Sequence, residues 1–273
     1  MRCPIKSGIR PKKSLGQHFL SHQGIIRRIV ETARIKAGDD VLEIGPGRGG
    51  LTKALIDAGA SVIAIELDRD LCAGLRAKFS GNSGFELIEG DCLSISFSEI
   101  AERKKGRLKL VSNLPYNISS PVLFKLMDER QSFSLMALML QKEVALRIAS
   151  GPDSKDYGIL SVLLQTFFHV KKEFDVPPGF FYPRPKVASS VVRLMPIEGP
   201  NISPEQEGFY RKTVKTAFGQ RRKTLLNVLK KLCPDTDALN HALNHASIDP
   251  KRRAETLSID EFIRLSSTLG RLC

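Results

Sequence analysis

The feature that most constrains this chain is a short, largely apolar run, Val41–Ile44, that ends at the glycine-rich stretch Gly45–Gly50. A run of this kind closed by glycine is typical of a buried strand, and the next residues, Leu51–Asp57, are expected to form a helix. A strand, a glycine-rich turn and a helix in this order form the ligand-binding corner of an open α/β sheet, because glycine lets the backbone approach a ligand closely. We therefore expect the chain to fold around such a sheet.

Strand-like and helix-like segments alternate along the chain on both sides of this corner. Apolar residues recur at helical spacing between residues 22 and 35, which predicts an amphipathic helix before the first strand. A third helix is expected at 70–79. Further strands are expected at 61–65, 85–88, 108–111 and 135–140, the last of them central, with a late antiparallel edge strand at 187–195. This alternation predicts a parallel sheet covered by helices on both faces.

The pattern breaks at residues 196–204 (PIEGPNISP), where three prolines and one glycine mark a linker. Ser203 followed by Gln206, with Pro204 at the first helical position, predicts the start of a helix. The rest of the chain has a helical pattern, and four leucines between Leu225 and Leu232 form one apolar stripe. We expect an α/β domain with a basic N-terminal segment over 1–198 and a small all-α domain over 199–273.

The net charge of +13 is unevenly distributed. Residues 1–36 hold nine Lys and Arg against one acid, residues 200–273 hold thirteen against eight, and the middle of the chain is neutral. A neutral body with two basic ends indicates a polyanionic partner, although a solvated basic surface explains charge alone equally well. A membrane surface is not favoured, because no basic helix with a wide apolar face is evident.

The five cysteines are scattered and none has CxxC or metal-ligand spacing. We therefore expect no metal site, no disulfide framework and a location in the reducing cytoplasm. The longest apolar run, Leu135–Leu140, is far shorter than the about 18 residues that a membrane helix needs.

The glycine-rich stretch is compatible with two kinds of cofactor. Gly45, Gly47 and Gly50 satisfy the GxGxxG spacing of dinucleotide-binding folds, and Glu66 lies about twenty residues further on, as a ribose-binding acid would. Taken alone, this pattern also allows a nicotinamide or flavin dehydrogenase. Glu43, however, would repel a pyrophosphate but suits a cationic methionine group, and Pro46 lacks the N–H that a phosphate-binding loop uses. Both details favour S-adenosylmethionine.

Two acids at expected strand ends suit the nucleoside of that cofactor. Glu66, after the second strand, can accept hydrogen bonds from both ribose hydroxyls. Asp91, after the third strand, can accept from the adenine amine. Each acid alone could be a helix cap or a loop charge, but the ordered set of acids and glycines at strand ends is more specific.

The most specific element is Asn113–Leu114–Pro115–Tyr116, which follows the fourth expected strand. The lone pair on the exocyclic amine (N6) of adenine is delocalised into the ring, so methylation requires that it be localised. The amide oxygen of Asn113 and the carbonyl of Leu114 can do this by accepting both N6 hydrogens. Pro115 stiffens the loop, and Tyr116 offers a flat face on which an extracted base can stack. These residues predict an adenine methyltransferase.

The chain as a whole resembles the KsgA-type ribosomal RNA adenine dimethyltransferases. The similarity covers nearly the whole chain in order. It is carried by LGQHFL (15–20), EIGPGRGGLT (43–52), IELD (65–68), Asp91, NLPYNIS (113–119), LQKEV (140–144), YG (157–158), FYPRPKV (181–187) and AFGQRRKTL (217–225).

The resemblance implies a Rossmann-like S-adenosylmethionine-dependent methyltransferase sheet with a small C-terminal all-α RNA-binding domain. It implies that two adjacent adenosines near the 3′ end of small-subunit ribosomal RNA (16S rRNA) each receive two methyl groups, with that RNA or a pre-30S particle as the partner and a monomer as the expected state. The target base would be held from opposite sides by Tyr116 and Phe181, and RNA would be bound by Arg221, Arg222 and Lys223. The cofactor would be bound by His18, Leu20, Gly45, Gly47, Glu66, Asp91 and Asn113. His18 departs from many relatives, which have Asn at this position.

Several alternatives remain open at this stage. Some relatives methylate large-subunit ribosomal RNA, although NLPYNIS and the QRRK segment favour the small-subunit branch. A non-catalytic nucleic-acid-binding relative would bind without turnover, and the intact loop at Asn113 argues against it. A DNA adenine methyltransferase would share that loop, but no large target-recognition domain is evident. A dehydrogenase is the remaining, remote possibility.

Overall fold

A computed structural model describes residues 11–12, 15–220 and 222–272. The chain divides into two compact units. The first contains residues 1–145 and 171–196, and the second contains 146–170 and 197–273. The second unit thus extends beyond the helical domain that we expected at 199–273, because it also includes residues 146–170, which lie between the two segments of the first unit.

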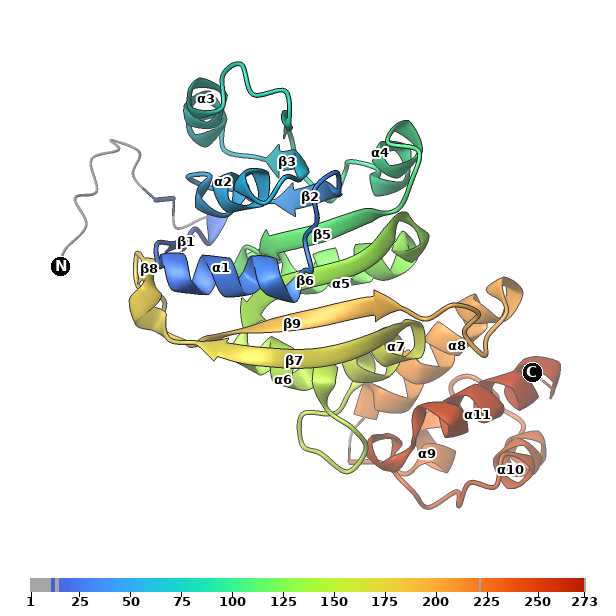
Figure 1. The fold of residues 1–273 in the computed structure, drawn as a ribbon. Coiled ribbons are helices and arrows are strands. Elements are labelled where there is room, and N and C mark those ends of the chain that lie inside the picture. The colour runs from blue at the N-terminus through green and yellow to red at the C-terminus, as the bar shows by residue number, and fades with distance from the viewer. Residues whose placement is uncertain (1–10, 13–14, 221, 273) are drawn as a thin grey trace. The chain divides into compact units, whose positions relative to one another are not determined.

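The first unit is built on a seven-stranded sheet with the order β4-β3-β2-β5-β6-β9-β7 (Figure 1). β2 pairs in parallel with both β3 and β5, so the strand order reverses direction at β2. Open α/β sheets bind ligands at such a switch point. The strands are β2 (Asp40–Ile44), β3 (Ser61–Glu66), β4 (Phe85–Glu89), β5 (Leu108–Asn113), β6 (Phe133–Gln141), β7 (Phe168–Val176) and β9 (Ser189–Pro196).

Helices cover both faces of this sheet, as expected. Ile25, Ile26 and Ile29 of α1 pack with Leu51 and Leu55 of α2 against alternate residues of the strands. The other face carries α4. The ring of its Phe97 packs edge to face on that of Phe133 in β6, with the two ring centroids 5.8 Å apart. The helices are α1 (Gln23–Thr32), α2 (Gly50–Asp57), α3 (Arg69–Lys78), α4 (Phe97–Arg103), α5 (Ser119–Asp128) and α6 (Lys142–Ala149).

The expected α/β class is confirmed, and one strand assignment is wrong. Residues 189–196 do form an antiparallel strand, but β9 lies between β6 and β7 and is not the edge. The edge is β7 (FHVKKEFDV), which the sequence analysis missed. Its charged residues are typical of an exposed edge strand, but they hide the alternation that identifies a strand in the sequence.

A second, two-stranded sheet joins distant parts of the first unit. β1 (Phe19–Leu20) pairs antiparallel with β8 (Phe181–Tyr182), so Phe19 lies opposite Tyr182 and Leu20 opposite Phe181. Short 3₁₀ turns occur at η2 (Tyr116–Ile118), η3 (Arg130–Ser132), η4 (Pro178–Phe180), η5 (Phe218–Gln220) and η6 (Ala254–Thr256).

The second unit is helical. Its helices are α7 (Ile159–Phe167), α8 (Pro204–Ala217), α9 (Leu225–Leu229), α10 (Thr236–His245) and α11 (Ile259–Leu272). α8 begins as predicted, with Ser203 as N-cap and Pro204 in the first turn. One hydrogen bond inside this unit joins distant segments, since the buried Tyr157 hydroxyl donates to the Leu257 carbonyl at 2.9 Å. The leucine stripe is only partly helical, because α9 ends at Leu229.

Two further expectations concern the cysteines and the membrane. Cys72 and Cys92 are buried free thiols, whereas Cys233 is disulfide-bonded, which the expectation of no disulfide framework did not anticipate. In the described part of the chain, no helix has the length and apolarity required to span a bilayer.

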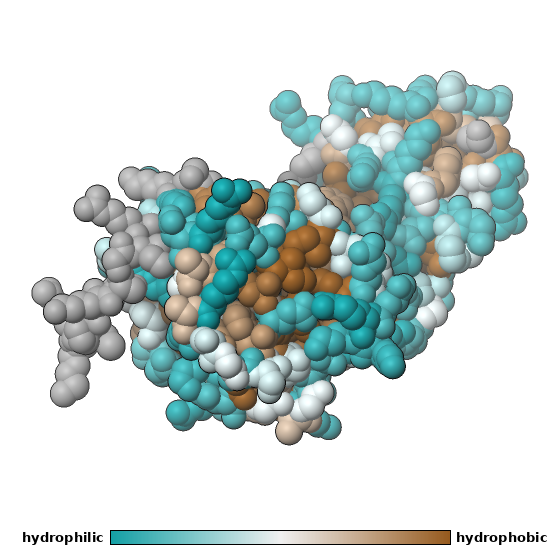
Figure 2. Space-filling model, turned by 90° about the horizontal axis from the view of Figure 1, so that it is seen from above, coloured by the Kyte–Doolittle hydropathy of each residue, from teal (hydrophilic) through white to brown (hydrophobic). Residues whose placement is uncertain are grey.

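Figure 2 shows apolar side chains gathered in a hollow bordered by hydrophilic residues on the face that it draws.

Candidate active site

A cavity of about 380 Å³ lies in the first unit at the carboxyl ends of the parallel strands. This volume falls within the range of small-molecule sites. Ten residues singled out from the sequence line it: His18, Leu20, Gly45, Gly47, Glu66, Asp91, Asn113, Leu114, Pro115 and Tyr116. Residues separated by almost a hundred positions therefore meet in one place. Eight of the ten end or follow β2, β3, β4 or β5, whose carboxyl ends lie at one edge of the sheet, whereas His18 and Leu20 come from the N-terminal segment.

The glycine-rich loop after β2 depends on its glycines. Gly45, Gly47 and Gly49 have φ values of +66°, +58° and +67°, in the left-handed region that side chains disfavour. At Gly47 a Cβ atom would also lie 2.9 Å from Cδ1 of Phe19. The Gly47 N–H donates to Oε2 of Glu66 at 3.2 Å. A backbone donor that a phosphate-binding loop would direct at its ligand is thus already bound to a carboxylate.

Glu66, at the end of β3, is buried, and its carboxylate is held in place by backbone N–H groups. Its Oε1 atom accepts from the N–H groups of Leu67 and Asp68, both at 3.0 Å, while Oε2 accepts from Gly47. Burial raises the pKa of this carboxyl, and the three backbone donors oppose that shift. A carboxylate fixed in this way at the cavity wall can accept further hydrogen bonds from a ligand.

Glu43, in β2, is a second buried carboxyl on the cavity wall. Thr52 donates to its Oε2 atom at 2.6 Å. Burial raises the pKa of Glu43 to about 8, and the nearby charge of Glu66 contributes to the shift. Lys78 partly opposes it, and its ammonium group is held by the carbonyls of Arg48 and Gly49. The Gly47 N–H is already bound to Glu66, and this makes the cavity unsuited to a pyrophosphate, which would need that donor.

Asp91 follows β4 and lies at the exposed end of the cavity. Its Oδ1 atom accepts from the N–H of Leu93 at 2.9 Å, which fixes the side chain in the turn. Leu67, which the sequence analysis did not single out, also lines the cavity with an exposed apolar side chain. Only its position directly after Glu66 could have indicated it.

The Asn113 side chain, at the end of β5, is oriented by the N-terminal segment. Its Nδ2 atom donates to the carbonyl of His18 at 3.0 Å. Its Oδ1 atom is buried and, within the described residues, has no hydrogen-bond partner. Because an unpaired buried acceptor is costly, such an atom in a cavity wall indicates that a ligand supplies the missing donor.

Tyr116 stands beside this amide in the turn after β5. Its hydroxyl is 2.6 Å from the Oγ atom of Ser189, and its ring centroid is 5.3 Å from that of His18. Leu114 is buried, and its N–H donates to the Met139 carbonyl at 3.2 Å. The neighbouring strand β6 therefore fixes the start of the loop, and Ser189 in β9 fixes the tyrosine.

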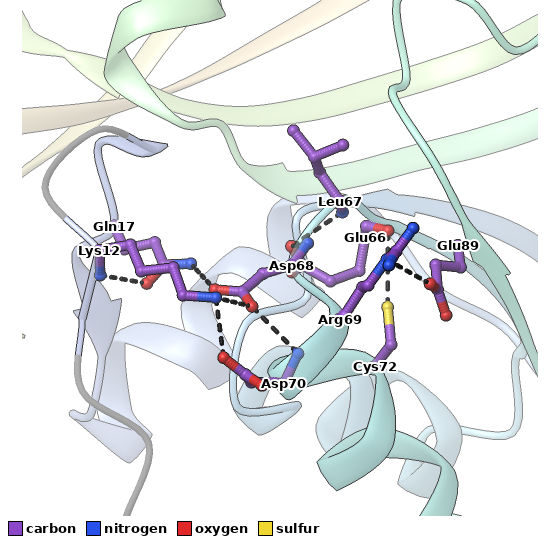
Figure 3. A network of polar contacts seen from close by, with 9 residues as sticks. All are labelled: Lys12, Gln17, Glu66, Leu67, Asp68, Arg69, Asp70, Cys72 and Glu89. Carbon is purple, nitrogen blue, oxygen red and sulfur yellow. Dashed lines mark hydrogen bonds and ion pairs between the residues drawn. The ribbon is translucent and has the colours of Figure 1, made fainter.

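A polar network ties the N-terminal segment to the loop after Glu66 (Figure 3). Asp68 is buried and accepts from Lys12 at 2.6 Å and from Gln17 at 2.8 Å, while Asp70 accepts from Lys12 at 2.8 Å. These donors lower the pKa of Asp68 against the effect of burial. The network continues through His18, the residue after Gln17, to Asn113. The sequence analysis missed it because no spacing links residues 12, 17 and 68.

Phe181 does not line the cavity. Its side chain is buried in the apolar core with α1 and α2, and its stacking on a base opposite Tyr116 stays a prediction. The next residue, Tyr182, is exposed and lines the cavity. Neighbouring residues of a strand point to opposite faces, so pairing with β1 turns Phe181 inward and Tyr182 outward.

The predicted RNA-binding cations belong to the second unit and do not line the cavity. Arg222 and Lys223 are exposed in the turn between η5 and α9, and not on a helix as expected. Arg221 lies outside the described residues. No cluster of His, Cys, Asp and Glu able to hold a metal ion occurs in the part of the chain that the structure describes.

The sheet order, the switch-point cavity and the acids at the strand ends define a Rossmann-like methyltransferase domain. The chain matches the family "Ribosomal RNA adenine dimethylase" over residues 8–270, and it belongs to that family.

Known relatives have similar sequences and folds. The chain is 46% identical to ribosomal RNA small subunit methyltransferase A of Geobacter sulfurreducens, over 96% of each chain. It is 45% identical to the protein of that name from Magnetococcus marinus, over 96% of this chain and 92% of the relative. A dimethyladenosine transferase from Plasmodium falciparum superimposes with a TM-score of 0.78 at 27% identity, over 90% of this chain and 95% of that one. The 23S rRNA methyltransferase ErmE does so with a TM-score of 0.71 at 26% identity, over 92% and 99%.

The raised pKa of Glu43 predicts a pH-dependent stability. Since the folded protein keeps this proton up to about pH 8 and the unfolded chain loses it near pH 4.5, stability falls as the pH rises between these values. Glu43→Gln retains an acceptor for Thr52 and removes the titration. The free energy of unfolding of the wild type should fall relative to the variant by up to about 1.4 kcal/mol per pH unit. Urea titrations at pH 5 to 9 measure this, and parallel profiles would contradict it.

Proposed function

We propose that this protein transfers methyl groups from S-adenosylmethionine to the N6 atoms of two adjacent adenosines near the 3′ end of small-subunit ribosomal RNA. The observation that carries the proposal is the buried Oδ1 atom of Asn113, which lacks a donor while Nδ2 is bound to His18. Since Nδ2 is already used as a donor, the amide presents an acceptor, as an adenine amine requires.

The residues around Asn113 suit the demands of an amine nucleophile. Asn113 Oδ1 and the carbonyl of Leu114 would accept the two N6 hydrogens, which localises the nitrogen lone pair. Tyr116, held by Ser189, would stack on the extracted base. With N6 held in this way, the amine would be positioned to receive a methyl group, and the cationic amine so formed would lose a proton to water. A strong general base is unnecessary because that proton is acidic.

The cavity also suits the cofactor. S-adenosylmethionine would supply an electrophilic methyl group on a cationic sulfur atom. Glu66 would accept from its ribose and Asp91 from its adenine amine, and the glycine-rich loop, His18 and Leu20 would complete the site. A dinucleotide fits poorly, since the Gly47 N–H that would bind its phosphate is already bound to Glu66.

The identity of the substrate is supported by the relatives. Proteins named for the small ribosomal subunit match at 45 to 46% identity, whereas the large-subunit enzyme ErmE matches at 26%. We infer that the protein acts in the cytoplasm on small-subunit RNA or a pre-30S particle, as a monomer, and that the helical C-terminal region contributes RNA contacts. The intact loop at Asn113 favours catalysis over mere binding.

The choice of cofactor is tested by calorimetry. The protein should bind S-adenosylmethionine and not NAD, and Glu66→Ala should weaken binding by roughly 1–3 kcal/mol through the loss of charged hydrogen bonds. Glu89→Ala is the matched control, because Glu89 ends the neighbouring strand but pairs with Arg76 outside the cavity. Binding of NAD, or unchanged affinity in Glu66→Ala, would remove the basis for this assignment.

The reaction is tested by Asn113→Ala. Loss of the acceptor should lower the methyl-transfer rate by ~10²-fold or more, as does removal of one preorganised polar group from other reacting centres. RNA affinity should change far less. Single-turnover kinetics with saturating cofactor and RNA measure the rate, with Tyr116→Phe as a control that keeps the stacking ring. Wild-type rates in Asn113→Ala would exclude the mechanism.

The role of the exposed cations is tested by salt dependence. Arg222→Gln/Lys223→Gln should flatten the decline of RNA affinity with salt, because fewer counterions are released, while cofactor affinity stays constant. Arg103→Gln/Lys105→Gln removes the same charge at the amino end of β5, away from the cavity. If both pairs changed the slope equally, or neither did, Arg222 and Lys223 would have no specific part in RNA binding.

A further inference from the structure

One aromatic ring at the cavity has no part in the function proposed above. Tyr182 is 48% exposed, and it is the aromatic member of the large apolar side chains that are exposed in the described part of the chain. It also lines the cavity. An exposed aromatic ring at the edge of a ligand site is a candidate contact, because it offers a large flat surface that loses little conformational freedom on binding.

The ring stands on a rigid support. In the small sheet, Tyr182 lies opposite Phe19, and the guanidinium of Arg48 is 4.7 Å from the Phe19 ring centroid and 5.8 Å from that of Tyr182. Phe19 in turn lies against the Cα atom of Gly47, where no side chain fits. Tyr182, Phe19 and Arg48 thus form one surface, the Tyr182 platform, built directly on the glycine-rich loop.

This chemistry suits an unpaired nucleobase. Every base has a π-face that stacks on an exposed aromatic ring, and an arginine beside that ring attracts the sugar-phosphate backbone that accompanies the base. A small apolar ligand would not require the cation, and a peptide would require backbone donors or acceptors that the three side chains do not provide.

The position of the platform separates it from the target base. The His18 ring contacts Tyr116 on one side, while its Nδ1 atom lies 2.7 Å from the carbonyl of Pro183, the residue after Tyr182. Tyr116 and the residue after Tyr182 therefore contact the same histidine, while the Tyr182 ring lies beside Arg48. Two rings so placed can hold two neighbouring bases of one strand.

We propose that the Tyr182 platform binds, by stacking, the base next to the target adenine in the RNA. The inference rests on the proposed function. For a substrate with two adjacent adenosines, it means that one adenine is held on Tyr182 while the other is methylated beside Asn113. Tyr182 is then a substrate-positioning residue.

The test uses an RNA oligonucleotide with 2-aminopurine next to the target adenine, since the fluorescence of this base is quenched when it stacks. Addition of the wild-type protein should quench it. Tyr182→Leu, which keeps the bulk without the ring, should abolish the quenching and raise the Kd for RNA about 5- to 100-fold, the range expected for one lost base stack. Tyr182→Trp should behave like the wild type. Affinity for S-adenosylmethionine should be the same in all variants.

Val187→Ala is the matched control, because Val187 is 45% exposed but does not line the cavity. It should leave both quenching and RNA affinity unchanged. The proposal is overturned if Tyr182→Leu keeps the wild-type Kd and quenching, or if it weakens binding of S-adenosylmethionine instead of RNA. If the wild-type protein neither binds nor methylates the RNA, the proposed function itself fails. If the wild type does both and only Tyr182→Leu shows no effect, the proposal for Tyr182 fails and the proposed function stands.

Discussion

The structure of the first unit depends on the reversal of strand order at β2. Because β3 lies on one side of β2 and β5 on the other, the loops that follow these strands diverge and leave a cavity at their carboxyl ends. The glycine-rich loop, Glu66 and Asn113 all occupy this edge. A sheet with sequential strand order would cover it with successive helices, so the site is a consequence of topology before it is one of side-chain chemistry.

Within the cavity, two buried carboxyl groups and an unpaired amide oxygen indicate the chemistry of the ligand. Glu43 and Glu66 lose solvation, which raises the pKa of each carboxyl, and Asn113 Oδ1 lacks a donor. Such groups disfavour the empty folded state and become favourable only when a ligand of matching charge and hydrogen-bond donors is bound. Ribose hydroxyls would supply donors to Glu66, and the amine of a target adenine would supply the donor that Asn113 Oδ1 lacks.

The N-terminal segment connects the two halves of this site. Lys12 and Gln17 bind Asp68, two residues beyond Glu66, and the next residue, His18, holds the amide of Asn113. β1 then pairs with β8 and places Tyr182 at the rim. One short stretch of chain therefore orients groups on both the Glu66 side and the Asn113 side of the cavity, although it contributes little to the seven-stranded sheet itself.

The sequence by itself determined the α/β class, most strands, and the ten cavity residues, because each lies in a local pattern: glycines after an apolar run, or an acid or amide at a strand end. Tertiary structure alone decided what depends on contacts between distant segments. It placed β7 at the edge and residues 146–170 with the second unit, bound Lys12 and Gln17 to Asp68, and turned Phe181 inward and Tyr182 outward. Which face of a two-residue strand is buried depends on its partner, and the partner of β8 lies about 160 residues away in the sequence.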